Sequence, residues 1–222
     1  MSDILMDFFE YNTENKLNKA ILYCKNDRET SKDYVNSLLE VPIEKYIEYV
    51  NFNRPRNSVL SKDVVQFSNF DDATIGICSK LKKIDNPGLK FVDVGRLLLD
   101  DGKERKDGAY VKYGENHVKT AATLGLVFEF YNTFYLSCIG EEYIELPEND
   151  QKRLLSRLII RSSLISRMLQ ATQNGRVNMR EFLYMLSDST YTRRKSNIKK
   201  MVDYLYLSEE YDFIAFIENI NF

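Results

Sequence analysis

Two segments of the chain carry residue types that can contact nucleic acid, and both have helical spacing. Asn and Arg can make paired hydrogen bonds to purine edges, Lys can reach guanine or phosphate, and Thr can meet a base or a phosphate. Basic residues crowd the second segment, in Arg193-Arg194-Lys195 and Lys199-Lys200. A solvated helix face is the plain alternative. The candidate DNA-contacting residues are Asn116, His117, Lys119, Thr120 and Thr123 in the first segment, and Arg193, Arg194, Ser196, Asn197, Lys199 and Lys200 in the second.

The two segments share one pattern of residue types and lie about 80 residues apart, which indicates two copies of one unit. When Glu115–Val127 is set over Lys195–Leu207, apolar positions and one lysine correspond. Further back, Gly88 corresponds to Gly175, and each glycine lies between two amphipathic runs. The first copy is slightly longer, and we assign its extra residues to a polar connection at Asp101–Tyr113.

Each copy ends in a β-like run with a turn near its middle, at Phe128–Ser137 and at Ser208–Ile217. A helix that leads into a hairpin is how a winged helix-turn-helix unit ends. We therefore predict a mainly α-helical protein of tandem winged helix-turn-helix units, each with three helices and a β-hairpin. The expected divisions are an N-terminal helical extension at 1–57, a first unit at 58–147 and a second at 148–222.

The spacing of apolar residues predicts which side of each repeated helix is buried. On the first helix, Val118, Ala121 and Ala122 fall on the inward side. Asn116, Thr120 and Thr123 fall roughly opposite, with His117 and Lys119 on the flanks. On the second helix the inward residues are Ile198, Met201, Val202 and Leu205, and the outward ones are Ser196 and Lys200, flanked by Arg193, Asn197 and Lys199.

Composition limits the function without naming it. The chain has 222 residues, 44% of them hydrophobic and 29% charged, which is ordinary for a globular protein. Its net charge of −2 argues against a non-specific nucleic-acid coat protein. It has no apolar run of transmembrane length and no signal-peptide pattern, so we expect a cytoplasmic protein without a membrane partner. Three scattered cysteines and a single histidine provide no zinc-ligand spacing.

A catalytic site is not evident. Asp93 followed by Glu104-Arg105-Lys106 resembles the acidic and lysine residues of a magnesium-dependent nuclease on paper. Lys103–Asp107 is a polar, glycine-flanked loop, whereas such a site needs a strand to hold its residues. His117 has no second histidine or paired cysteine, which favours a surface or DNA-facing role over catalysis. We expect no catalytic residue, metal or cofactor, although a small magnesium-dependent nuclease stays open as an alternative.

Residues 72–217 resemble the winged-helix modules of restriction-endonuclease recognition regions, such as those of type IIS enzymes. In these modules a helix ending in a Leu-Gly-Leu-type signature runs into a wing and then a glycine-containing turn. Here the signature is Leu124-Gly125-Leu126, and Gly140 follows. The motif is short and generic to winged helices. The resemblance implies DNA recognition more firmly than it implies restriction.

Three functions follow from these patterns. The first is sequence-specific binding of double-stranded DNA, as the recognition component of a restriction or defence system, with a nuclease subunit or a second copy of the chain as a further partner. The second is a protein–protein adaptor, because the second hairpin carries Glu209, Glu210 and Asp212, which would repel phosphate. The third is the small nuclease.

Overall fold

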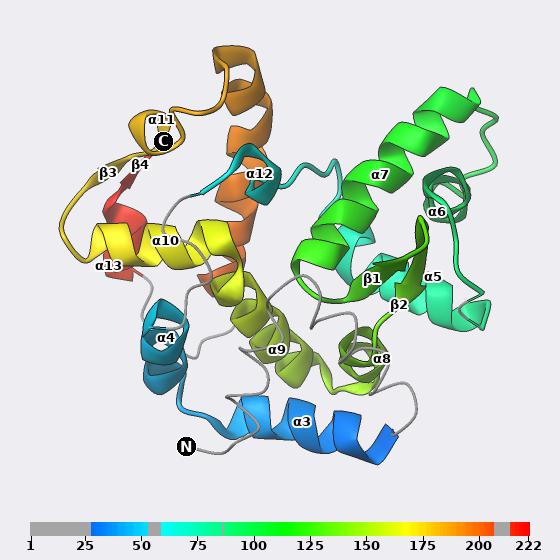
Figure 1. Cartoon of the computed structure of the whole chain (residues 1–222), viewed down its shortest axis with the longest axis horizontal. Helices are drawn as coiled ribbons and strands as arrows, with labels where there is room; N and C mark the ends of the chain where they lie inside the picture. Colours follow the sequence, from blue (N-terminus) through cyan, green and yellow to red (C-terminus); the bar gives the residue numbers. More distant parts are fainter. Residues whose placement is uncertain (1–27, 53–58, 86, 207–213) are drawn as a thin grey trace. The chain divides into compact units, whose positions relative to one another are not determined.

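The computed structural model is mainly α-helical, as the sequence predicts, and describes residues 28–52, 59–85, 87–206 and 214–222 (Figure 1). The described residues divide into two compact units. Unit 1 takes its residues from 28–38 and 66–147, and unit 2 takes its residues from 39–65 and 148–222. The sequence expectation placed residues 1–57 in a separate extension, whereas residues 39–65 are counted here with unit 2.

Unit 1 contains a helical pair, a hairpin and the helices around them. In chain order its elements are most of α3 (Arg28–Glu40), a π-helical turn at Asp72–Gly76, α5 (Ile77–Lys83), α6 (Phe91–Leu98), α7 (Asp107–Thr123), β1 (Val127–Phe130), β2 (Thr133–Leu136) and α8 (Cys138–Glu145). The last residues of α3 belong to unit 2.

Two glycines let α6 and α7 approach each other closely. A side chain at Gly95 would place its Cβ 2.0 Å from the carbonyl oxygen of Tyr110, and one at Gly114 would place it 1.9 Å from the carbonyl oxygen of Phe91. Both distances are well inside contact, so no other residue fits without moving the backbone. This pairing fixes α7 along one side.

Glycine also ends α7 and starts the hairpin. Gly125 has a φ of 78°, its amide donates to the carbonyl of Ala122, and the amide of Leu126 donates to that of Ala121. This is a Schellman ending, which turns the chain sharply into β1. β1 and β2 pair antiparallel around Tyr131-Asn132, which confirms the predicted first hairpin. Leu89 then pairs antiparallel with Phe134 of β2.

Unit 2 consists of helices and two short strands. Its elements are α4 (Ile43–Phe52), a 3-10 turn at Ser61–Asp63, α9 (Glu148–Arg161), α10 (Ser163–Thr172), β3 (Val177–Asn178), α11 (Met179–Phe182), α12 (Asp188–Leu205), α13 (Ile214–Glu218) and β4 (Ile220–Asn221). The Ser187 side chain caps α12 by accepting a hydrogen bond from the Thr190 amide. As predicted, Ile198, Met201, Val202 and Leu205 are buried.

Two sequence expectations were wrong. The proposed connection at Asp101–Tyr113 is helical from Asp107 onward, because α7 begins there. The second hairpin was expected at Ser208–Ile217, but Ile214–Glu218 is helix α13. The remainder of that predicted hairpin lies outside the described residues. The strand that closes unit 2 is β4, and it pairs parallel to β3. Within the described ranges, no helix is both long enough and apolar enough to cross a membrane.

Candidate nucleic-acid interface

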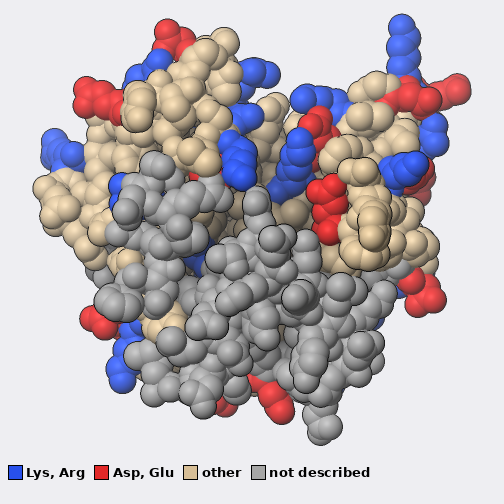
Figure 2. Space-filling view, in the orientation of Figure 1, with Lys and Arg blue, Asp and Glu red and all other residues tan. Residues whose placement is uncertain are grey.

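The outward side of α12 is a stripe of cations and hydroxyl groups, which we call the α12 stripe. Residues three, four and seven apart share a side of a helix, so the stripe continues from the first turn of α12 to the last. Figure 2 shows Lys and Arg atoms along the edge of unit 2 where α12 runs in Figure 1. Its exposed members are Ser189, Thr192, Arg193, Ser196, Lys199, Lys200 and Asp203, with Lys195 half-buried at its border.

Within the described part of the chain, no acidic side chain forms an ion pair with the exposed cations of the α12 stripe. Among the described residues, Arg193, Lys199 and Lys200 make no ion pair, although Asp203 follows one turn later. Arg193 instead donates to the carbonyl of Ser189 at 3.3 Å. At the start of the helix, Asp188 is held by Arg180 at 2.7 Å. Cations that lack an acidic partner can bind phosphate without first giving up an ion pair.

Arg194 does not belong to the stripe, which corrects its predicted role. Its guanidinium donates to the carbonyl oxygens of Ser61 and Val64, both at 2.7 Å. These carbonyls belong to the 3-10 turn of unit 2 and the residue that follows it. Burial lowers the pKa of Arg194. The side chain therefore anchors the turn at Ser61–Asp63 to α12.

Asn197 was predicted to reach DNA bases from the flank of the helix, but only 4% of it is exposed. It lies at the border between the α12 stripe and the buried side. The spacing rule treats a flank as accessible, but this flank is covered in the structure. In this structure Asn197 is part of the packed interior of unit 2, not of its surface.

On α7 the outward cations are already paired. Lys119 is exposed, and its Nζ lies 2.6 Å from a carboxylate oxygen of Glu115. Lys112 lies 3.6 Å from the other oxygen of the same carboxylate. The bond from Lys119 lowers the pKa of Glu115. Asn116 and Thr123 are half-buried. The candidate surface of α7 is therefore closer to neutral than the α12 stripe.

His117 and Thr120 are fully buried, so the expected surface position of both was wrong. The Thr120 hydroxyl donates to the carbonyl of Asn116 at 2.9 Å and lies 3.3 Å from that of Gln66. The Asn69 amide donates to Nε2 of His117 at 3.4 Å. The predicted orientation assumed one packing side for α7, but the segment 66–69 covers a second.

His117 holds this segment against α7 through a small polar cluster. Its Nδ1 lies 2.7 Å from the carbonyl of Tyr113, so Nδ1 carries the proton and Nε2 accepts. The two rings stack at 4.0 Å, and the Tyr113 hydroxyl donates to Asp72 at 2.6 Å. Burial lowers the pKa of His117, and burial with the Asp72 contact raises that of Tyr113 to about 12. The neutral imidazole is the form that fits this site.

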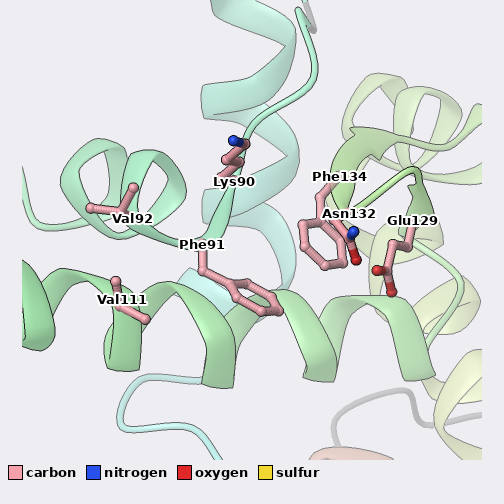
Figure 3. A pocket seen from close by; sticks show the side chains of 7 residues that line it. All are labelled: Lys90, Phe91, Val92, Val111, Glu129, Asn132 and Phe134. Atoms are coloured by element: carbon pink, nitrogen blue, oxygen red, sulfur yellow. The ribbon is translucent and has the colours of Figure 1, made fainter.

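Unit 1 contains a shallow groove of about 350 Å³ that was not predicted from the sequence. One wall comes from α6 and α7 and the other from the hairpin, and the rings of Phe91 and Phe134 stack at 4.8 Å between them (Figure 3). The sequence feature that indicates this groove is the run of aromatic residues in the hairpin, which we interpreted as a wing. The groove is lined by Lys90, Phe91, Val92, Val111, Glu129, Asn132 and Phe134.

Within residues 28–52, 59–85, 87–206 and 214–222, no three His, Cys, Asp or Glu side chains gather as a metal site would require. Comparison of the chain with protein-family models, with curated proteins and with solved structures gives no match.

Proposed function

We propose that unit 1 is a winged helix and that unit 2 is a divergent second copy. Unit 1 runs α5, a strand residue at Leu89, α6, α7, β1 and β2, with Leu89 paired to β2. Unit 2 runs α10, β3, α11 and α12 in the same order. In both, a glycine of positive φ precedes the first strand residues, Gly88 at 78° and Gly175 at 122°. The parallel closure of β3 by β4 is where the second copy departs.

We further propose that the protein binds double-stranded DNA in a sequence-specific manner through α12. The observation that carries this is the α12 stripe, whose cations Arg193, Lys199 and Lys200 are exposed and make no ion pair among the described residues. α12 follows the short helix α11 after a four-residue turn and Ser187, as a recognition helix does in a helix-turn-helix. The major groove is about 12 Å wide and admits one α-helix.

The stripe divides into groups for phosphate and groups for bases. Arg193, Lys199 and Lys200 supply charge for phosphates, which positions the helix without reading sequence. The hydroxyls of Ser189, Thr192 and Ser196 lie among them and replace Asn197 as candidates for base contacts, since Asn197 is buried. The resemblance to restriction-enzyme recognition regions makes a restriction or defence system the setting in which we propose this binding.

Protein contact is the second candidate function, and it concerns unit 1. Glu115 neutralises the cations of α7, and the hairpin from Val127 to Leu136 contains no Lys or Arg. A wing of this composition offers phosphate no cation to bind. Unit 1 is therefore better suited to contact protein, while unit 2 contacts DNA.

The experiment is a fluorescence-anisotropy titration of labelled duplex DNA with the full chain at low salt. Replacing Arg193, Lys199 and Lys200 together with Ala should weaken binding at least about tenfold, since three phosphate contacts are lost. The matched control replaces Lys103, Lys106 and Lys112, three exposed lysines of unit 1, and changes the net charge equally. Circular dichroism establishes that both variants are folded. Equal weakening by the two variants, or no binding by the native chain, would overturn the proposal in favour of the adaptor.

A further inference from the structure

The groove of unit 1 has two walls of opposite charge. Lys90 stands on the wall formed by α6 and α7, beside Phe91, Val92 and Val111. Glu129 stands on the hairpin wall (Figure 3). Both charged residues are exposed, and in the described part of unit 1 neither makes an ion pair. Between them lies an apolar floor, which no described segment fills.

The tip of the same hairpin presents aromatic surface to solvent. Tyr131 is 85% exposed and Phe130 is 43% exposed, and their rings meet edge-on at 4.4 Å. Tyr131 also has a φ of 49°. Bulky residues seldom adopt this left-handed conformation, which two-residue hairpin turns usually fill with Asn or Gly. A conformational cost and an exposed ring at one position point to a contact that the single chain does not make.

We propose that unit 1 forms a symmetric dimer in which the open side of the groove in one copy packs against the open side of the groove in the other. A two-fold axis brings the hairpin wall of one copy against the α6–α7 wall of its partner. Each Glu129 then faces the Lys90 of the other copy, twice per dimer. The aromatic tip at Tyr131 gains apolar contact with the partner copy on closure.

The charges around the groove favour protein over nucleic acid as the occupant. Glu129 projects from the hairpin wall, and no Lys or Arg accompanies it on β1 or β2. A phosphate backbone would meet this carboxylate, whereas a second copy of the chain brings a lysine to it. Dimerisation through unit 1 does not depend on DNA binding by α12.

Charge reversal tests the pairing directly, with the dimer dissociation constant measured by sedimentation equilibrium on the full chain. The native chain should dimerise reversibly. Lys90→Glu and Glu129→Lys should each weaken the dimer at least tenfold, because two like-charge contacts replace two opposite ones. The double variant should return to within about threefold of the native constant. Mixing the two single variants should also restore a dimer, because every contact in the mixed dimer again joins opposite charges.

A second variant separates dimer contact from folding. Tyr131→Asn places a residue that tolerates positive φ at the tip, so the thermal unfolding midpoint should rise or stay the same at concentrations where only monomer is present. The dimer should nonetheless weaken by tenfold or more. A native chain that remains monomeric up to millimolar concentration would overturn the proposal. So would a double charge reversal that fails to recover the dimer, or a Tyr131→Asn chain that dimerises as the native one does.

Discussion

α7 and α12 are the longest described helices of their units, yet their outward sides differ in charge. Each follows a strand residue and a shorter helix, and each buries an apolar side. On α7, Glu115 holds Lys112 and Lys119. On α12, Arg193, Lys199 and Lys200 make no ion pair among the described residues. Two long helices with similar apolar sides therefore differ in surface charge, because ion pairs with Glu115 neutralise the lysines of α7.

The largest expected effect concerns the packing that α7 has and α12 lacks. α12 contains no glycine, whereas Gly114 of α7 lies against the backbone of α6. Gly114→Val should lower the free energy of unfolding by about 3 kcal/mol, because its side chain would overlap the carbonyl of Phe91. Urea unfolding measures this. Gly108→Ala is the control, since a Cβ at that exposed position of α7 would have no atom of another segment within 4 Å. Native stability in Gly114→Val would contradict the close approach.

Within α12, neighbouring arginines should separate into a structural one and a binding one. Arg194→Ala removes two hydrogen bonds to the carbonyls of Ser61 and Val64 and should cost about 2 kcal/mol of unfolding free energy. Arg193→Ala should change stability by less than about 0.5 kcal/mol and weaken DNA binding instead. Chemical denaturation and a DNA titration of each variant give the two readouts. Identical behaviour of the two variants would contradict a structural role for Arg194 and a binding role for Arg193.

The stability of unit 1 should depend on pH through His117. Burial lowers its pKa in the folded protein, so the unfolded chain takes up the proton first as the pH falls. The stabilisation is present above the unfolded value of about 6.5 and is lost as the pH falls toward the folded value. Thermal unfolding from pH 8 to pH 5 should therefore show a steeper loss for the native chain than for His117→Gln. Parallel curves of unfolding midpoint against pH would show that His117 does not contribute to the pH dependence of stability.

The smallest effect comes from releasing the lysines of α7. Glu115→Gln should cost about 0.3–0.5 kcal/mol of helix stability and should raise DNA affinity modestly, because Lys112 and Lys119 lose their shared partner. Glu148→Gln is the control, since Glu148 pairs with Lys152 in α9 at the same spacing. Anisotropy titrations should show a gain for the first variant alone. A gain in DNA affinity of equal size in both variants would show that the effect comes from net charge alone.

The sequence predicted the scaffold better than the surface. Apolar spacing located the buried sides of α7 and α12, and Gly125 located the end of α7, because these features depend on local chain geometry. The sequence did not predict the helical start of α7, because Asp107 and Gly108 are typical of a loop. The pairing of α7 with α6 was not predicted either, because it depends on glycines distant in sequence.

The predicted surface positions of three candidate site residues were wrong, because they depend on tertiary packing. His117, Thr120 and Asn197 have polar side chains on helix flanks, which spacing alone places near solvent. In the structure, residues 66–69 cover the first two, and Asn197 is packed into unit 2. The groove between α6 and the hairpin depends on which strand pairs with Leu89, and no periodicity within one segment reveals that.

The most direct test of the difference between α7 and α12 is the salt dependence of DNA binding. Each neutralised phosphate contributes roughly 0.9 to the slope of log affinity against log salt. Replacing Arg193, Lys199 and Lys200 with Ala should flatten that slope by about 2.7 if each contacts one phosphate. Replacing Lys103, Lys106 and Lys112 should leave it unchanged. A slope that flattens equally in both triple variants, or only in the unit 1 variant, would contradict the assignment of phosphate contact to α12.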